Sequence, residues 1–223
     1  MHSDFGSSRL VRQLGEAAPV DAPAPGMDFA ERLSLWLNAF DAIALQSAQQ
    51  AIRAIRTAAP PRPGAPRPPT AATLAEDLAR VRSVLSRAIG RELDPLATAL
   101  PASVAPGADP GYAPYLHRHQ ALQRQMDQLI APLRDHARQA LAAASPRLRQ
   151  LAALDATLEH LLAPREQALL PTVAQLLERR YAQTSPEAFD REWRLALLAE
   201  LDLRLEPVTG LVEALQHESE HQP

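Results

Sequence analysis

The chain has 223 residues, of which 46% are hydrophobic and 4% aromatic, and its formal net charge is −3. This length and apolar content suffice for one hydrophobic core or for two small ones. The absence of cysteine excludes disulfides, thiolate zinc sites and a cysteine nucleophile. The net negative charge argues against a protein that binds nucleic acid over its whole surface.

The apolar residues are mainly Ala and Leu, which favour helices over strands. The N-terminus lacks an apolar run of signal-peptide length, and no later segment reaches the ~18 uncharged residues of a membrane span. We therefore expect a cytoplasmic all-α protein without a membrane span. Its fold would be a bundle of about five to seven helices, with proline-kinked long helices and two proline-rich linkers.

The first long helix is predicted to begin near Asp28, which can cap it, and to run towards Thr57. Its apolar residues recur at steps of three or four and predict a face towards the core: Phe29, Leu33, Trp36, Phe40, Ile43 or Ala44, Ala48, Ile52 and Ile55. The following run AAPPRPGAPRPPT cannot be helical, because proline lacks an amide donor. Residues 1–57 are thus an N-terminal helical segment, and 58–73 a Pro/Arg-rich linker.

Three further parts follow in chain order. Residues 74–100 predict a helix up to about Leu93, and 101–114 form a second Pro/Gly-rich break. Residues 115–216 predict a C-terminal bundle that would join the earlier helices in one composite bundle, and 217–223 a polar tail. Within the bundle, Ser145-Pro146 and Ser185-Pro186 each place an N-cap before a first-turn proline, which indicates a helix start. Pro132, Pro164 and Pro171 predict kinks or restarts.

The tail sequence His217-Glu218-Ser219-Glu220-His221 fits H-E-x-x-H, the pattern of zinc peptidases. A catalytic zinc site needs a third protein ligand, and only Gln222 and Pro223 follow. Di-iron bundles need Glu-x-x-His pairs on facing helices, and the helical interior contains none. No nucleophile elbow or phosphate-binding loop occurs either. We therefore predict no catalytic, cofactor-binding or metal-binding residues, and no enzymatic activity.

Two polar pairs inside the helical segments have structural interpretations. His117 and His119 are expected to be solvated side chains at a helix N-terminus, beside tyrosines that pack on the end of the bundle. Glu200 and Arg204, at positions i and i+4, are typical of an ion pair on a helix surface.

Charge is unevenly distributed along the chain. Residues 53–91 contain eight Arg against two acids, and residues 185–223 contain three Arg against nine acids. The basic segment could bind nucleic acid or anionic lipid, although it lacks aromatic side chains that would stack on bases. The two ends could also attract each other or a second copy.

Five stretches in this order resemble a proteobacterial family catalogued as domain of unknown function three-three-four-eight: SSRLVRQLGE, FAERLSLWLNAFDAIAL, LQRQMDQLIAPLRDHAR, LAALDATLEHLLAPREQALL and LLAELDLRLEPVTGLVEAL. The resemblance implies cytoplasmic helical proteins without an assigned activity. It also implies genes that neighbour those for stator-like membrane proteins of the flagellar-motor and Tol/Exb type. The polar residues of these stretches are the candidate interaction surface: Arg32, Asp41, Arg134, Asp155, Glu166 and Arg204.

The leading hypothesis is a non-enzymatic helical adaptor or scaffold. Its partner would be a protein, such as a subunit of a stator-like membrane complex at the inner membrane, or a second copy of the chain. The alternative is a protein that binds nucleic acid or anionic lipid through the Arg-rich segment 53–91, with a salt-sensitive affinity. An enzyme remains open if the core contains a polar pocket lined by perturbed carboxylates or histidines.

Overall fold

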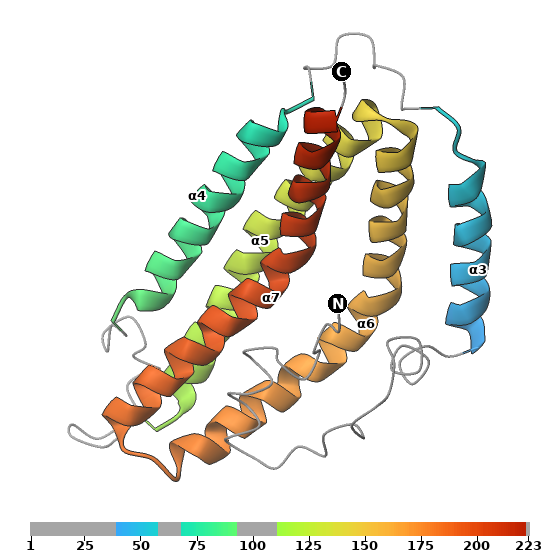
Figure 1. Ribbon diagram of the computed structural model, residues 1–223. Helices are drawn as coiled ribbons and strands as arrows, with labels where there is room; N and C mark the ends of the chain where they lie inside the picture. The colour runs from blue at the N-terminus through green and yellow to red at the C-terminus, as the bar shows by residue number, and fades with distance from the viewer. Residues whose placement is uncertain (1–38, 58–67, 93–110, 222–223) are drawn as a thin grey trace, which may run out of the picture. The chain divides into compact units, whose positions relative to one another are not determined.

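The computed structural model describes residues 39–57, 68–92 and 111–221, and leaves the side chains of 39, 40, 165–172 and 221 undescribed. These residues are almost entirely helical and contain no strand, so the all-α fold class is confirmed (Figure 1). The helices in chain order are α3 (Ala39–Ala54), α4 (Ala71–Gly90), α5 (Ala113–Ala144), α6 (Pro146–Tyr181) and α7 (Pro186–His221). The predicted start at Asp28 and most of both proline-rich segments lie outside the described residues.

Side-chain caps determine where three helices begin. Ser145 Oγ accepts a hydrogen bond from the Leu148 amide at 3.2 Å, and Ser185 Oγ accepts one from the Ala188 amide at 3.4 Å. Pro146 and Pro186 occupy the first helical position, where an amide would have no partner. Both predicted starts are confirmed. Helix α4 begins three residues earlier than predicted, because Thr70 caps it through the Thr73 amide.

The long helices tolerate their internal prolines. Helix α5 continues through Pro132, and α6 through Pro164 and Pro171, so the chain does not restart at these positions. Helix α7 likewise continues through Pro207 and ends at His221, so the segment expected as a polar tail forms its last turn. Burial of the preceding apolar face explains this extension, since Leu211, Val212 and Leu215 are buried.

The chain divides into two compact units, and both draw on the same long helices. Unit 1 contains, among the described residues, 76–92, 111–133 and 169–206. Its core is formed by Leu85, Ile89, Leu122, Met126, Ile130, Leu133, Leu177, Phe189, Trp193, Leu197, Leu201 and Leu205.

The contacts in unit 1 define its helix directions. Gln123 meets Glu200 and Asp127 meets Arg204, each pair 77 residues apart, so α5 and α7 run in the same direction (Figure 1). Helix α4 runs opposite to α7. Arg194 Nη1 donates to the Gly90 carbonyl, and Arg118 Nη2 from α5 donates to the Ala88 carbonyl. These two guanidinium groups satisfy carbonyls that would otherwise lack partners at the end of α4.

Unit 2 contains, among the described residues, 39–57, 68–75, 134–168 and 207–221. Its core is formed by Leu74, Ala137, Ala140, Leu141, Leu148, Ala152, Leu161, Val208, Leu211, Val212 and Leu215. Helices α5 and α6 are antiparallel there, since they are joined by Ser145 alone. Two hydrogen bonds attach the end of α3 to α6. Gln150 donates to the Ile55 carbonyl at 3.0 Å, and Arg149 to the Thr57 carbonyl at 3.2 Å.

Candidate functional site

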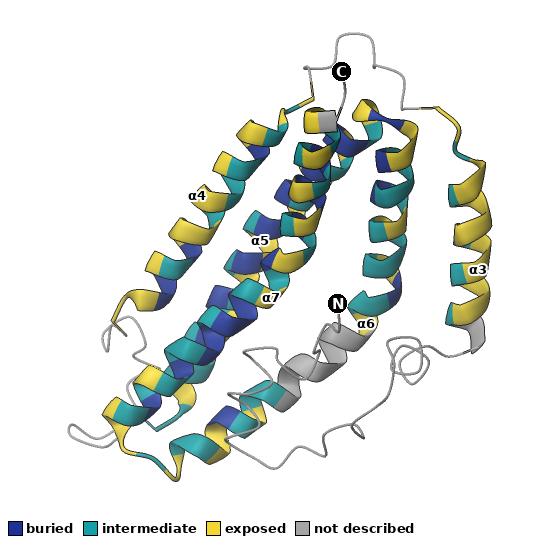
Figure 2. Ribbon diagram, in the orientation of Figure 1, coloured by how far each residue is buried: buried dark blue, intermediate teal, exposed yellow. Residues whose placement is uncertain are grey.

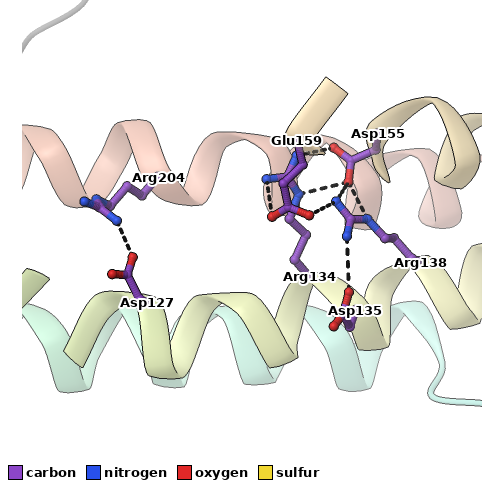
Figure 3. A network of polar contacts seen from close by, with 7 residues as sticks. All are labelled: Asp127, Arg134, Asp135, Arg138, Asp155, Glu159 and Arg204. Carbon is purple, nitrogen blue, oxygen red and sulfur yellow. Dashed lines mark hydrogen bonds and ion pairs between the residues drawn. The ribbon is translucent and has the colours of Figure 1, made fainter. Parts of the chain in front are cut away.

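Unit 2 contains a network of ion pairs between α5 and α6, which we call the Asp155 network: Arg134, Asp135, Arg138, Asp155 and Glu159 (Figure 3). The two arginines are four residues apart on α5, and Asp155 and Glu159 are four apart on α6. This spacing puts each pair on one helix face. Arg134 Nη2 lies 2.6 Å from Asp155 Oδ1 and its Nε 2.9 Å from Asp155 Oδ2, which is a bidentate pair. Arg138 Nε donates to the same Oδ2 at 2.7 Å.

The Asp155 network is largely withdrawn from solvent, because the side chains of Arg134, Arg138 and Asp155 are 16%, 14% and 13% exposed. Burial pushes the pKa of Asp155 upward, but the hydrogen bonds and charges of the two arginines outweigh it and hold the pKa below its usual value. Burial also opposes the charge of Arg138, yet Glu159 and Asp155 raise its pKa. The charges of the network are therefore paired with one another. We interpret these ion pairs as a structural link that holds α5 against α6, and we call this the fastening role of the network.

Unit 1 contains a second polar group between α5 and α7, which we call the Glu200 cluster: His119, Gln123, Asp127, Glu200 and Arg204. Glu200 Oε1 accepts hydrogen bonds from Gln123 Nε2 at 3.1 Å and from Arg204 Nε at 2.9 Å. Arg204 Nη1 also reaches Asp127 Oδ1 at 2.5 Å (Figure 3). The predicted pairing of Glu200 with Arg204 is confirmed, but Glu200 is only 7% exposed. The pair therefore belongs to the interior and not to a helix surface.

His119 is the largest departure from the sequence prediction. We expected a solvated side chain, but His119 is 2% exposed, and neither ring nitrogen has a hydrogen-bond partner. The cause is the register of α5, in which His119 precedes Leu122 and Met126 at steps of three and four on the buried face. Extending that apolar stripe back by one turn would have placed the histidine inside. His117, two residues away, is exposed as predicted.

An aromatic group lies at the start of α5 in unit 1. Tyr115 meets Phe189 at a ring-centroid distance of 4.9 Å and Trp193 at 5.3 Å, both edge to face. Tyr112 also contacts Phe189 and donates its hydroxyl to the Ala174 carbonyl at 3.0 Å. Burial, with a contribution from Glu178, raises the pKa of Tyr112 to about 12. The tyrosines thus pack against other helices, as predicted, and Tyr112 remains protonated at neutral pH.

The six candidate surface residues do not form one group among the residues that the structure describes. Arg134 and Asp155 pair directly in unit 2, whereas Arg204 belongs to the Glu200 cluster of unit 1. Asp41 is half-buried on α3. Arg32 and the side chain of Glu166 lie outside the description. The role of these residues as an interaction surface stays a prediction.

The basic segment is partly engaged by the protein's own acids and carbonyls. Arg80 pairs with Asp77, Arg87 donates to the Ser83 carbonyl, and Arg82 pairs with Asp202 of α7. The last contact joins the basic and acidic parts of the sequence within unit 1. Arg62 and Arg67 lie outside the described residues.

In the described part of the chain, no three His, Asp or Glu side chains are grouped so that they could hold a metal ion. No helix in this part is long and apolar enough to cross a membrane.

Residues 1–188 match the model of a family described as protein of unknown function, DUF3348. The match covers more than half of the sequence, so the chain belongs to this family. This confirms the resemblance, although the stretch 197–215 lies beyond the matched residues. No curated protein and no solved structure matches the chain.

Proposed function

We propose that this member of the DUF3348 family is a non-enzymatic helical adaptor whose partner-binding element is α3. The observation that carries the proposal is the exposure of this helix. None of the side chains from Asp41 to Thr57 is buried, and Ile43 is 62% exposed (Figure 2). A 16-residue helix is marginally stable in isolation, and helices in proteins gain most of their stability by packing an amphipathic face. A helix this exposed is suited to pack on a second protein.

The exposed side of α3 has the chemistry of a helix-packing surface. Ile43, Ser47, Ala51 and Ala54 recur at steps of four, four and three, so they share one face. All four are exposed and none is charged. Small side chains let two helices approach closely, and Ile43 supplies a large apolar anchor. The fitting partner is an uncharged, apolar helix face of another protein.

The attachment of α3 to unit 2 supports this role. Gln150 and Arg149 of α6 hold the carbonyls of Ile55 and Thr57, at the C-terminal end of α3. These two hydrogen bonds anchor the chain where α3 ends, and the exposed side chains along the rest of the helix can contact a partner. The two arginine–carboxylate groups have a different role, because their charges are paired with one another and stabilise the scaffold.

The partner and the location form the finer part of the proposal. The sequence resemblance suggests a subunit of a stator-like membrane complex, which would place the protein in the cytoplasm at the inner membrane. Binding of nucleic acid or anionic lipid is less favoured, because Arg80, Arg82 and Arg87 already have partners within the protein.

The test is capture of the partner by the tagged full-length chain from separated membrane and soluble fractions, with a photocrosslinker at Ala51 and mass spectrometry of the product. We expect one crosslinked membrane-complex subunit, and we expect Ile43→Glu to abolish it. Gln49→Glu adds the same charge at an exposed position away from this face and should leave capture intact. Equal capture by both variants, or retention of nucleic acid that Arg62→Ala plus Arg67→Ala removes, would refute the proposal.

A further inference from the structure

The imidazole of His119 occupies an unusual position within the Glu200 cluster. Its side chain is 2% exposed, and both Nδ1 and Nε2 are buried without a hydrogen-bond partner. Nε2 lies 3.7 Å from Glu200 Oε2, beyond hydrogen-bonding distance. Most buried polar side chains are hydrogen-bonded, so a histidine left in this state requires an explanation.

The charges of the Glu200 cluster do not balance while the imidazole is neutral. Glu200 and Asp127 carry two negative charges, Arg204 carries one positive charge, and Gln123 is neutral. Asp127 is 63% exposed, so water screens its charge, whereas Glu200 is buried and shares its cation, Arg204, with Asp127. One proton on His119 would balance the cluster and would give Glu200 a second cationic partner.

We propose that His119 and Glu200 form a proton-responsive switch in unit 1, in which protonation of the imidazole draws Glu200 away from Gln123 and Arg204. Protonated histidine donates from both ring nitrogens, and a charge-assisted bond to a carboxylate is about 2.7–2.9 Å long. The present separation of 3.7 Å must therefore shorten by about an ångström. Gln123 and His119 both lie on α5, so this movement transfers the α5 partner of Glu200 by one helical turn, from Gln123 to His119.

Other charged groups on the neighbouring helices have partners of their own, so the proposed response to protons depends on His119 and Glu200. From α7, Glu200 and Arg204 act on the imidazole, and Arg204 is shared with Asp127. On α4, Arg82 is directed to Asp202, and on α6, Arg180 is directed to Glu192. Both of those ion pairs involve exposed or half-exposed side chains, outside the buried environment of His119.

The pH dependence of stability follows from the pKa of His119 in the folded protein, where the imidazole is neutral. Burial lowers the pKa of His119 from its usual 6.5, Glu200 opposes this effect, and Arg204 adds to it. The unfolded chain therefore binds a proton more readily than the folded one. Neutral His119 therefore contributes to the free energy of unfolding. This contribution is complete above the pKa that His119 has in the unfolded chain, and it is lost as the pH falls below about 6.5 towards the pKa of the folded state. Protonation of His119 in the folded protein therefore requires a pH below 6.5.

The first measurement is denaturant unfolding of the full chain between pH 8 and 5.5. For wild type, the folding equilibrium constant should fall by at most about tenfold per pH unit below 6.5 on account of His119. His119→Leu should flatten this dependence, since it removes the titrating group and two unpaired polar atoms while keeping an apolar side chain in the core. His136→Gln, at an exposed position of the same helix, should keep the wild-type slope.

The second measurement is an NMR titration of the imidazole signals of the wild-type protein, which decides the question even if His119→Leu does not fold. The His119 signal should stay in its neutral position at pH 6.5 and move only in more acidic solution. Glu200→Gln should lower the midpoint further, because the carboxylate is the group that favours the proton. A midpoint at or above 6.5, or a wild-type slope in His119→Leu, would overturn the proposal.

Discussion

Each of the two units pairs arginines with carboxylates between α5 and a second helix, which is α6 in unit 2 and α7 in unit 1, but with different outcomes. In the Asp155 network, two arginines face Asp155 and Glu159 across helices joined by a single residue. Each of these four side chains has at least one partner of opposite charge, and Asp155 has two. The result is a set of ion pairs that joins two helices adjacent in the chain, and in it the two arginines hold the pKa of Asp155 below its usual value.

The Glu200 cluster of unit 1 is instead assembled from residues 77 positions apart, and it includes a group that can change its charge. Its carboxylate is shared between Arg204 and Gln123, while His119 remains unpaired. In the Asp155 network two arginines are the partners of two carboxylates, whereas in the Glu200 cluster Glu200 and Asp127 share one arginine. The proposed switch would add His119 as the second cation of the Glu200 cluster.

The largest effect is expected from Asp155→Ala, which removes the shared partner of two poorly exposed guanidinium groups. We expect a loss of about 2–3 kcal/mol in the free energy of unfolding, because Arg134 and Arg138 would keep only Glu159 and Asp135. Denaturant unfolding monitored by circular dichroism would measure this loss.

Asp135→Ala is the matched control, since Asp135 is 63% exposed and bonds only to Arg138 among the contacts seen. It should cost less than about 0.5 kcal/mol. Equal losses in the two variants would contradict the fastening role.

The sequence predicts helix starts and side-chain pairs where these depend on residues within one helical turn of each other. Ser145-Pro146 and Ser185-Pro186 mark the starts of α6 and α7, because the cap and the first-turn proline act within one turn. The pairing of Glu200 with Arg204 was equally local. The sequence could not show that Glu200 would also meet Gln123 and His119, because that depends on the register between α5 and α7, set by packing of residues far apart in the chain.

The prolines show the limit of local rules. An interior proline costs about 3 kcal/mol in an isolated helix, which predicts a kink or a restart at Pro132, Pro164 and Pro171. The helices continue because burial of their apolar faces offsets this cost: Leu133 and Leu161 beside these prolines are buried. The candidate surface residues were chosen by chemistry alone, and only Arg134 and Asp155 could be recognised as a pair once α5 and α6 were known to be antiparallel.

A titration should separate the two units by the pH at which each responds. As the pH falls below 6.5, backbone amide NMR signals near Gln123 and Glu200 should shift together with the imidazole signals of His119, while those near Arg134 and Asp155 should not. Because the arginines hold the pKa of Asp155 below its usual 3.8, the stability supplied by the Asp155 network is present above that value. It is lost only as the pH falls through the lower pKa of the folded state. Simultaneous movement of both sets of signals in mild acid would remove the distinction between the two groups.

The smallest effect is expected at Arg82 and Asp202, the pair that joins the basic and acidic parts of the sequence. Their side chains are 47% and 41% exposed, so water and salt screen the attraction, and holding two flexible side chains together costs entropy. A double-mutant cycle with Arg82→Ala and Asp202→Ala should give a coupling of about 0.5 kcal/mol or less, vanishing in about 1 M salt. A larger coupling that survives salt would mean that long-range charge pairing orients α4 in unit 1. The expected small value means that burial of Leu85 and Ile89, and not this ion pair, holds α4 in place within unit 1.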